Sequence, residues 1–169
     1  VPLAWRRVYC GVFEMVRDRV TYWFIDNEAY FKRSQIYGHF DDGERFAYFS
    51  RAVLETVGQL DWTPDIIHCN DWQTALIPIY LLEDRYRIPQ LGRAKTVFTI
   101  HNIEYQGRYG SQILEDVLGL DKSYFNEGML AYHGDVNLMK GAIISSSFVT
   151  TVSPTYAQEL RYPFYAHGM

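Results

Sequence analysis

The sequence has 169 residues, of which 48% are hydrophobic and 21% charged, and its 16 Lys and Arg against 20 Asp and Glu give a formal net charge of −4. Such a composition can bury a core and excludes an intrinsically disordered chain. No basic block indicates a surface for nucleic acid or anionic membrane, and no apolar run approaches the ~18–20 residues of a membrane span. Cys10 and Cys69 make no disulfide framework and suit a reducing compartment.

Aromatic residues make up 17% of the chain, a high fraction that has two interpretations. The ordinary one is core packing. The other is sugar binding, because an aromatic face stacks on the apolar face of a pyranose while a tyrosine hydroxyl reaches the sugar hydroxyls. Composition alone leaves both open.

The first third of the chain predicts a strand, a loop and a helix, in that order. Val20–Ile25 is β-branched and aromatic and predicts a strand. Asp26–Gly43 is polar and aromatic with turn residues, and predicts a long loop of the kind that is often functional. Apolar residues spaced three and four apart predict a helix over Arg45–Val57.

The middle of the chain has the pattern of a parallel strand–helix–strand unit. Asp65–Cys69 predicts a short buried strand, and Lys95–Ile100 predicts the next one. Between them Asp71 opens a second helix, whose free N–H groups an aspartate can cap. The whole unit is about 35 residues long, which suits two parallel strands joined by a helix.

The last third continues this alternation. Val117–Tyr132 is irregular or weakly helical, and Asp135–Ser145 predicts a helix. Phe148–Val152 predicts a strand, after which Pro154 fits the first turn of a helix ending near Arg161. The fold class expected for residues 1–169 is therefore a single α/β domain. Its sheet is expected to be open, mostly parallel and Rossmann-like, with helices on both faces.

Polar residues gather where the predicted strands end, which is where ligands of such sheets bind. Three segments follow strands, His68–Gln73, His101–Gly107 and Ser153–Tyr156. Their His, Asn, Asp, Gln and Tyr side chains suit a polyhydroxylated ligand. The first segment matches no zinc spacing, so no metal site is expected, and glycine-rich phosphate loops and a serine nucleophile elbow are absent from the sequence.

Each of these residues also has a purely structural interpretation. Asp71 can be a simple helix cap, His101 a buried histidine bonded to a backbone carbonyl, and Trp72 a core residue. Ser153 and Thr155 can cap the last helix. The local sequence leaves these alternatives open.

In these segments the sequence resembles a known family, the bacterial glycogen synthases and plant starch synthases. The runs H-x-x-D-W, T-I-H-N-x-x-Y-Q-G and V-T-T-V-S-P-T-Y are together highly specific, and the resemblance covers nearly all of the chain after about Val20. The matching segments follow the family's order: Tyr22–Gly38, Asp42–Glu55, Asp65–Leu76, Lys95–Gly107 and Asn137–Glu159.

The resemblance implies a retaining glucosyltransferase with the GT-B fold, in which two Rossmann-like domains face each other across a cleft. The reaction implied is transfer of glucose from ADP-glucose to the non-reducing end of an α-1,4-glucan, with no metal and no cofactor apart from the ADP-glucose substrate. No nucleic-acid or membrane partner is implied. The location implied is the cytoplasm of a bacterium or the plastid of a plant.

The resemblance also assigns roles to individual residues. It places His101 against the transferred glucose, as the catalytic residue. Gln73 is a departure, because many members carry His after the Asp-Trp pair. The substrate-binding residues implied are Asp71, Gln73, Asn102, Tyr105 and Gln106.

The chain departs from the family at both ends. It starts at Val1 without the family's Lys-x-Gly-Gly-Leu loop, and it stops at Met169 without the C-terminal nucleotide-sugar domain. We therefore expect an incomplete N-terminal, acceptor-side domain that is inactive by itself and prone to self-association.

Two other functions remain open. The first is a stand-alone glucan-binding or structural module, with an aromatic loop at Tyr30, Phe31 and Tyr37 holding sugar. The second is another GT-B enzyme such as a sucrose synthase, against which the T-I-H-N-x-x-Y-Q-G run argues.

Overall fold

The computed structural model describes every residue from Val1 to Met169. The strands are β1 (Pro2–Leu3), β2 (Arg6–Arg7), β3 (Gly11–Arg17), β4 (Val20–Asp26), β5 (Ile66–Asn70), β6 (Lys95–Ile100), β7 (Arg108–Gly110), β8 (Ala131–Tyr132), β9 (Asp135–Asn137) and β10 (Phe148–Thr151). The α-helices are α1 (Glu28–Phe31), α2 (Asp42–Val57), α3 (Leu76–Arg87), α4 (Leu138–Ser145) and α5 (Pro154–Glu159). Short 3₁₀ turns at Trp72–Thr74, Pro89–Leu91 and Lys122–Tyr124 and a π-helical turn at Leu114–Leu118 complete the chain.

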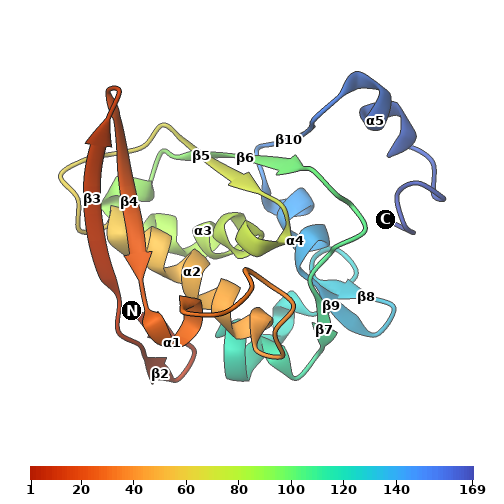
Figure 1. Cartoon of the computed structure of the whole chain (residues 1–169). Coiled ribbons are helices and arrows are strands. Elements are labelled where there is room, and N and C mark those ends of the chain that lie inside the picture. The colour runs from red at the N-terminus through yellow and green to blue at the C-terminus, as the bar shows by residue number, and fades with distance from the viewer.

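A three-stranded parallel sheet, in the order β10-β6-β5, forms the centre of the α/β fold (Figure 1). β5, α3 and β6 make the predicted strand–helix–strand unit, with β5 and β6 parallel and adjacent. β10 adds to the other edge of β6, also in parallel. Helices α2, α3 and α4 lie on one side of this sheet, and the α/β class with a parallel sheet is thereby confirmed.

The opposite face of the sheet carries no helix, so the expected covering of both faces is not found in this chain. Ile66 and Phe148 on the outer strands are 61% and 69% exposed. A hydrogen-bonded row crosses this face, from the His68 ring to Thr99 Oγ1 (2.6 Å) and from there to Thr150 Oγ1 (2.7 Å). The prediction that β5 is buried is therefore wrong, because it is an edge strand with one bare face.

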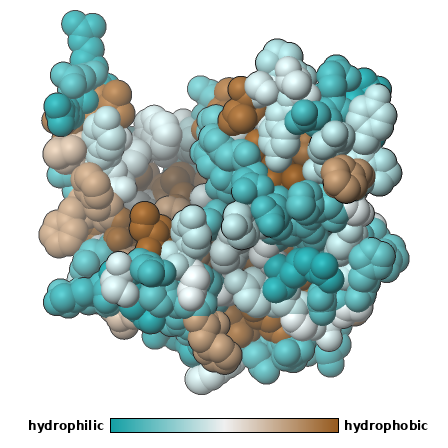
Figure 2. Space-filling model, turned by 45° about the vertical axis from the view of Figure 1, so that its right-hand side comes forward, coloured by the Kyte–Doolittle hydropathy of each residue, from teal (hydrophilic) through white to brown (hydrophobic).

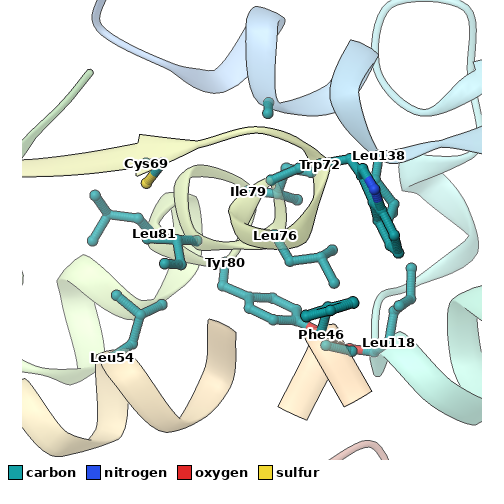
Figure 3. Close-up of a cluster of buried hydrophobic side chains, with 14 of the residues drawn as sticks. Phe46, Leu54, Cys69, Trp72, Leu76, Ile79, Tyr80, Leu81, Leu118 and Leu138 are labelled. Atoms are coloured by element: carbon teal, nitrogen blue, oxygen red, sulfur yellow. Dashed lines mark hydrogen bonds between the residues drawn. The ribbon is translucent and has the colours of Figure 1, made fainter. Parts of the chain in front are cut away.

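The core lies between the sheet and the helices (Figure 3). Cys69 points from β5 toward α3, where Leu76 and Ile79 pack, and Phe98 on β6 is fully buried with them. Fully burying one such side chain contributes about 1.5–3 kcal/mol. The Tyr80 hydroxyl, which is also buried, donates to the carbonyl of Leu118 at 2.7 Å and so leaves no unpaired polar group there.

The N-terminal part contains more structure than the sequence predicts. β3 and β4 form an antiparallel hairpin that stands at one side of the molecule (Figure 1). Its turn residues Asp18 and Arg19 both have positive φ, 52° and 64°, as the favoured two-residue hairpin turn requires. The predicted loop Asp26–Gly43 contains the short helix α1, which Asn27 caps by accepting from Tyr30 N, and its last two residues begin α2.

The predicted helix Asp135–Ser145 is wrong in its first three residues. These residues form β9, and the helix α4 begins only at Leu138. Asn137 ends the strand and caps α4, because its side-chain oxygen accepts from Lys140 N at 3.0 Å. Sequence periodicity does not separate a short strand from the first turn of a helix when a capping residue joins the two.

Candidate functional site

A cavity of about 490 Å³ opens beyond the carboxyl ends of β5 and β6, the position at which ligands of open α/β sheets bind. Its wall comes from the loop before α2, the turn after β5 and the loop after β6. Four of the six residues that the sequence analysis assigned to the site lie in this wall. The lining residues are Tyr37, Gly38, Asp42, Asp71, Trp72, Gln73, Asn102 and Tyr105.

Asp71 joins the ends of β5 and β6 through its side chain. Its Oδ1 accepts from the backbone N–H of His101 at 2.7 Å and from that of Asn102 at 3.3 Å. It makes no helix-capping bond, so the structural alternative of a simple cap is wrong. Its backbone has φ 55° and ψ −179°, a conformation almost restricted to glycine. Such strain at a cavity wall persists only where surrounding contacts hold the residue.

His101 lies at the end of β6, beside Asp71. Its ring is exposed, and its Nε2 lies 3.0 Å from the side-chain oxygen of Asn70. The alternative of a buried histidine satisfied by a backbone carbonyl is therefore wrong. The loop after His101 is held at a further point, where Ile103 N donates to the hydroxyl of Tyr156 at 3.0 Å. The ring is thus presented to solvent on a loop whose backbone is fixed.

The side chains of Trp72 and Gln106 are buried and pack in the protein interior. The Trp72 ring is buried, packs against Phe46 at 5.1 Å between ring centroids, and faces Gly107, as the core alternative predicts. A Cβ on Gly107, which has φ +65°, would lie 2.6 Å from that ring. Gln106 is buried and accepts from Asn137 Nδ2 at 2.6 Å. It does not line the cavity, so the structure does not bring it together with the other predicted site residues.

The three aromatic residues proposed to hold sugar, Tyr30, Phe31 and Tyr37, also differ in where their rings lie. The Tyr30 ring packs on Tyr48 at 4.9 Å, and Phe31 packs on both Tyr48 and Phe49. Only Tyr37 of the three proposed sugar-holding residues lines the cavity. At the other end of the chain, Ser153 Oγ accepts from Tyr156 N at 3.0 Å, which confirms the cap predicted for the last helix.

The chemistry of the cavity suits a neutral polyol. Its wall combines aromatic rings, amides and the carboxylate of Asp71, and none of its lining residues is Lys or Arg. A diphosphate would find no cation there, whereas sugar hydroxyls can bond to carboxylates and amides. Behind the wall, burial raises the pKa of Tyr109 to about 12, so that this phenol stays protonated.

Sequence reasoning missed Gly38 and Asp42 as wall residues and Asn70 as the partner of His101. Gly38 and Asp42 carry the ordinary signals of a turn and a helix start, and Asn70 that of a strand end, so nothing local distinguishes them.

No group of three or more His, Cys, Asp or Glu side chains in the chain is placed to hold a metal ion. None of its helices is long and apolar enough to cross a membrane.

Comparison with known proteins agrees with this geometry. The family model described as the starch synthase catalytic domain matches residues 1–169. The chain belongs to this family. The resemblance drawn from the sequence motifs is thereby confirmed.

Members of the starch synthase family similar to this chain include glycogen synthases from bacteria. That of Geobacillus thermodenitrificans is 53% identical over 170 residues, which cover 100% of this chain and 35% of the relative. That of Clostridium novyi is 46% identical and is covered to 36%. The catalytic domain of starch synthase IV from Arabidopsis thaliana, bound to ADP and acarbose, superposes with a TM-score of 0.84 at 39% identity, over 94% of this chain and 33% of that one. This chain thus spans about a third of the length of its relatives.

Proposed function

We propose that the protein containing this chain transfers glucose from ADP-glucose to the non-reducing end of an α-1,4-glucan with retention of configuration. The observation that carries the proposal is the Asp71 bridge, which holds His101 and Asn102 beside a sugar-sized cavity at the carboxyl ends of two parallel strands. Family membership supports the reaction class, and the starch synthase IV structure bound to ADP and acarbose supports the pairing of a nucleotide with a second ligand.

In this proposal the chain supplies the sugar-binding half of the active centre. Tyr37 and Tyr105 present rings and hydroxyls to the glucan, while Asn102 and Gln73 bond to its hydroxyls. The His101 ring bonds to the transferred glucose as its anomeric carbon becomes positive. Such a reaction needs no covalent nucleophile, because positioning and electrostatic stabilisation supply most of the rate. The cations for the diphosphate leaving group come from outside this cavity.

The test uses the full-length protein with radiolabelled ADP-glucose and glycogen. We expect label in the precipitated polymer, released again by an amylase specific for α-1,4 links, and no incorporation without glycogen. A parallel reaction with radiolabelled UDP-glucose at the same concentration compares the two nucleotide-sugar donors. Absence of incorporation from both donors, with a protein that gives a folded circular dichroism spectrum, would overturn the proposed function.

A further inference from the structure

Two buried side chains in the first turn of α2 hold the loop that carries Tyr37. Arg45 is 2% exposed although it is charged. Its Nε donates to the carbonyl of Tyr30 at 2.7 Å, and its Nη2 donates to the carbonyl of Ile36 at 3.1 Å. Its remaining nitrogen, Nη1, pairs with the carboxylate of Asp42. One guanidinium therefore links helix α2 to helix α1 and to the middle of the loop between them.

Asp42 completes the arrangement from the other side of Tyr37. It is 6% exposed, and its Oδ2 accepts from Gly38 N at 2.5 Å and from His39 N at 3.0 Å. The peptide groups before and after Tyr37 are thus both held, the first by Arg45 and the second by Asp42. The side chain of Tyr37 is itself 54% exposed and faces the cavity. The pair fixes the backbone while leaving the ring free for a ligand.

A buried ion pair of this kind is weak evidence for stability, because removing two charges from water costs about as much as their attraction returns. Its value lies in geometry, since a planar guanidinium bonds in fixed directions and a lysine cannot reproduce the fork. The backbone after Tyr37 is also constrained, because the φ of Gly38, +94°, lies in a region that residues with a side chain rarely adopt. The loop is therefore held in one shape at the cavity wall.

We propose that Arg45 and Asp42 are positioning residues that hold Tyr37 where it binds the sugar acceptor. The inference rests on the proposed function, because it assigns the cavity to the acceptor of that reaction. The acceptor is assigned rather than the nucleotide because no cation lines the cavity. Neither residue of the pair contacts the reacting atoms in this proposal. Loss of either residue therefore weakens binding of the acceptor and leaves the rate of the chemical step unchanged.

The decisive variant is Arg45→Lys in the full-length enzyme, with Arg51→Lys as its matched control. Arg51 lies on the same helix and also pairs with a largely buried carboxylate, that of Asp84, but it touches neither the loop nor the cavity. We expect Arg45→Lys to raise the KM for a short maltooligosaccharide about tenfold while kcat and the KM for ADP-glucose change less than about threefold. Arg51→Lys leaves both KM values within about twofold of the parent.

A second readout does not depend on activity. Lys32 and Arg33 begin the loop and offer trypsin two cleavage sites. Release of the loop by Arg45→Lys predicts faster cleavage after these residues than in Arg51→Lys, followed by mass spectrometry. Equal acceptor KM values and equal cleavage rates in the two variants would overturn the proposal.

If Arg45→Lys does not fold, Tyr37→Ala decides the matter, because the exposed ring can be removed without opening the core. We expect the same rise in acceptor KM, and an unchanged value would overturn the proposal because the loop would have nothing to position. The proposed function fails separately, by absence of transfer in the parent enzyme. An active parent with normal acceptor binding in both Arg45→Lys and Tyr37→Ala contradicts only the positioning role.

Discussion

The strained backbone of Asp71 makes a quantitative prediction that separates its conformation from its side chain. With φ 55° and ψ −179°, this residue occupies a region that costs a side-chain-bearing residue about 1–3 kcal/mol and costs glycine little. The carboxylate, through its bonds to His101 N and Asn102 N, stabilises the same turn. Replacement by glycine removes the carboxylate and the strain together, whereas replacement by alanine removes only the carboxylate.

The difference between the two variants isolates the strain, because both lose the same hydrogen bonds. Against the gain of about 1–3 kcal/mol, glycine loses about 0.5–1 kcal/mol through the greater freedom of its unfolded chain. We therefore expect Asp71→Gly to be more stable than Asp71→Ala by up to about 2.5 kcal/mol in free energy of unfolding, with the middle of the range at about 1 kcal/mol. Both variants lose activity, because the backbone of His101 and Asn102 loses the carboxylate that holds it at the cavity.

The assay is urea unfolding of the full-length protein followed by tryptophan fluorescence, since Trp72 adjoins the substituted residue. Steady-state kinetics on the same preparations measure the loss of activity, for which we expect at least about tenfold in kcat, the cost of one good polar contact. Asp71→Asn keeps an acceptor oxygen and should retain more activity than either variant. The reasoning is refuted if Asp71→Ala is more stable than Asp71→Gly, or if Asp71→Gly keeps the parent's activity.

Four further predictions concern the site and the isolated chain. His101→Ala in the full-length enzyme should lower kcat by roughly 10²–10³ with little change in the KM for ADP-glucose; a fall below about threefold would leave His101 without a role in the chemical step. Residues 1–169 alone should incorporate no label from ADP-glucose into glycogen above a protein-free blank, because the cavity has no cation for the leaving group. The same chain should self-associate through its exposed apolar surfaces, the bare face of the parallel sheet and one face of the β3–β4 hairpin, so light scattering should rise with concentration, and a monomer with a concentration-independent melt would contradict this. Burial raises the pKa of the Cys69 thiol from 9.0 to about 12, so the stability that the neutral thiol contributes is complete below pH 9 and is lost as the pH rises toward 12. The urea midpoint of the parent should therefore fall between pH 9 and 12, and Cys69→Ala should make this fall less steep. An equally steep fall in Cys69→Ala would contradict the prediction.

The exposed apolar surface behind the self-association prediction is visible on the molecule. Figure 2 shows brown, apolar groups at several places among the hydrophilic surface of the face drawn there. The hairpin contributes Phe13, Met15, Tyr22 and Phe24, all of which are exposed and which the strand register places on one face. Apolar faces of this kind pack against other protein surface rather than water.

The sequence by itself determined the strand–helix–strand unit and its place in the fold. Lys95–Ile100 is found with the predicted bounds, because a short β-branched run between turn signals has few other ways to bury its side chains. The rule that ligands bind beyond the carboxyl ends of parallel strands points to Asp71 and to the residues after Ile100, which is where the cavity lies. Family motifs pointed to the same residues.

Only the tertiary structure decided what each of those side chains does. Asp71 could have capped a helix, yet its carboxylate reaches the backbone 30 residues further along the chain. Gln106 sits among site residues in the sequence but turns inward, because Asn137 offers it a buried partner. The clamp that Asp42 and Arg45 place around Tyr37 carries no periodic signal at all. Periodicity reports which face of an element is buried, whereas the partner of a polar group is set by whichever chain segment packs against it, and that contact exists only in the folded molecule.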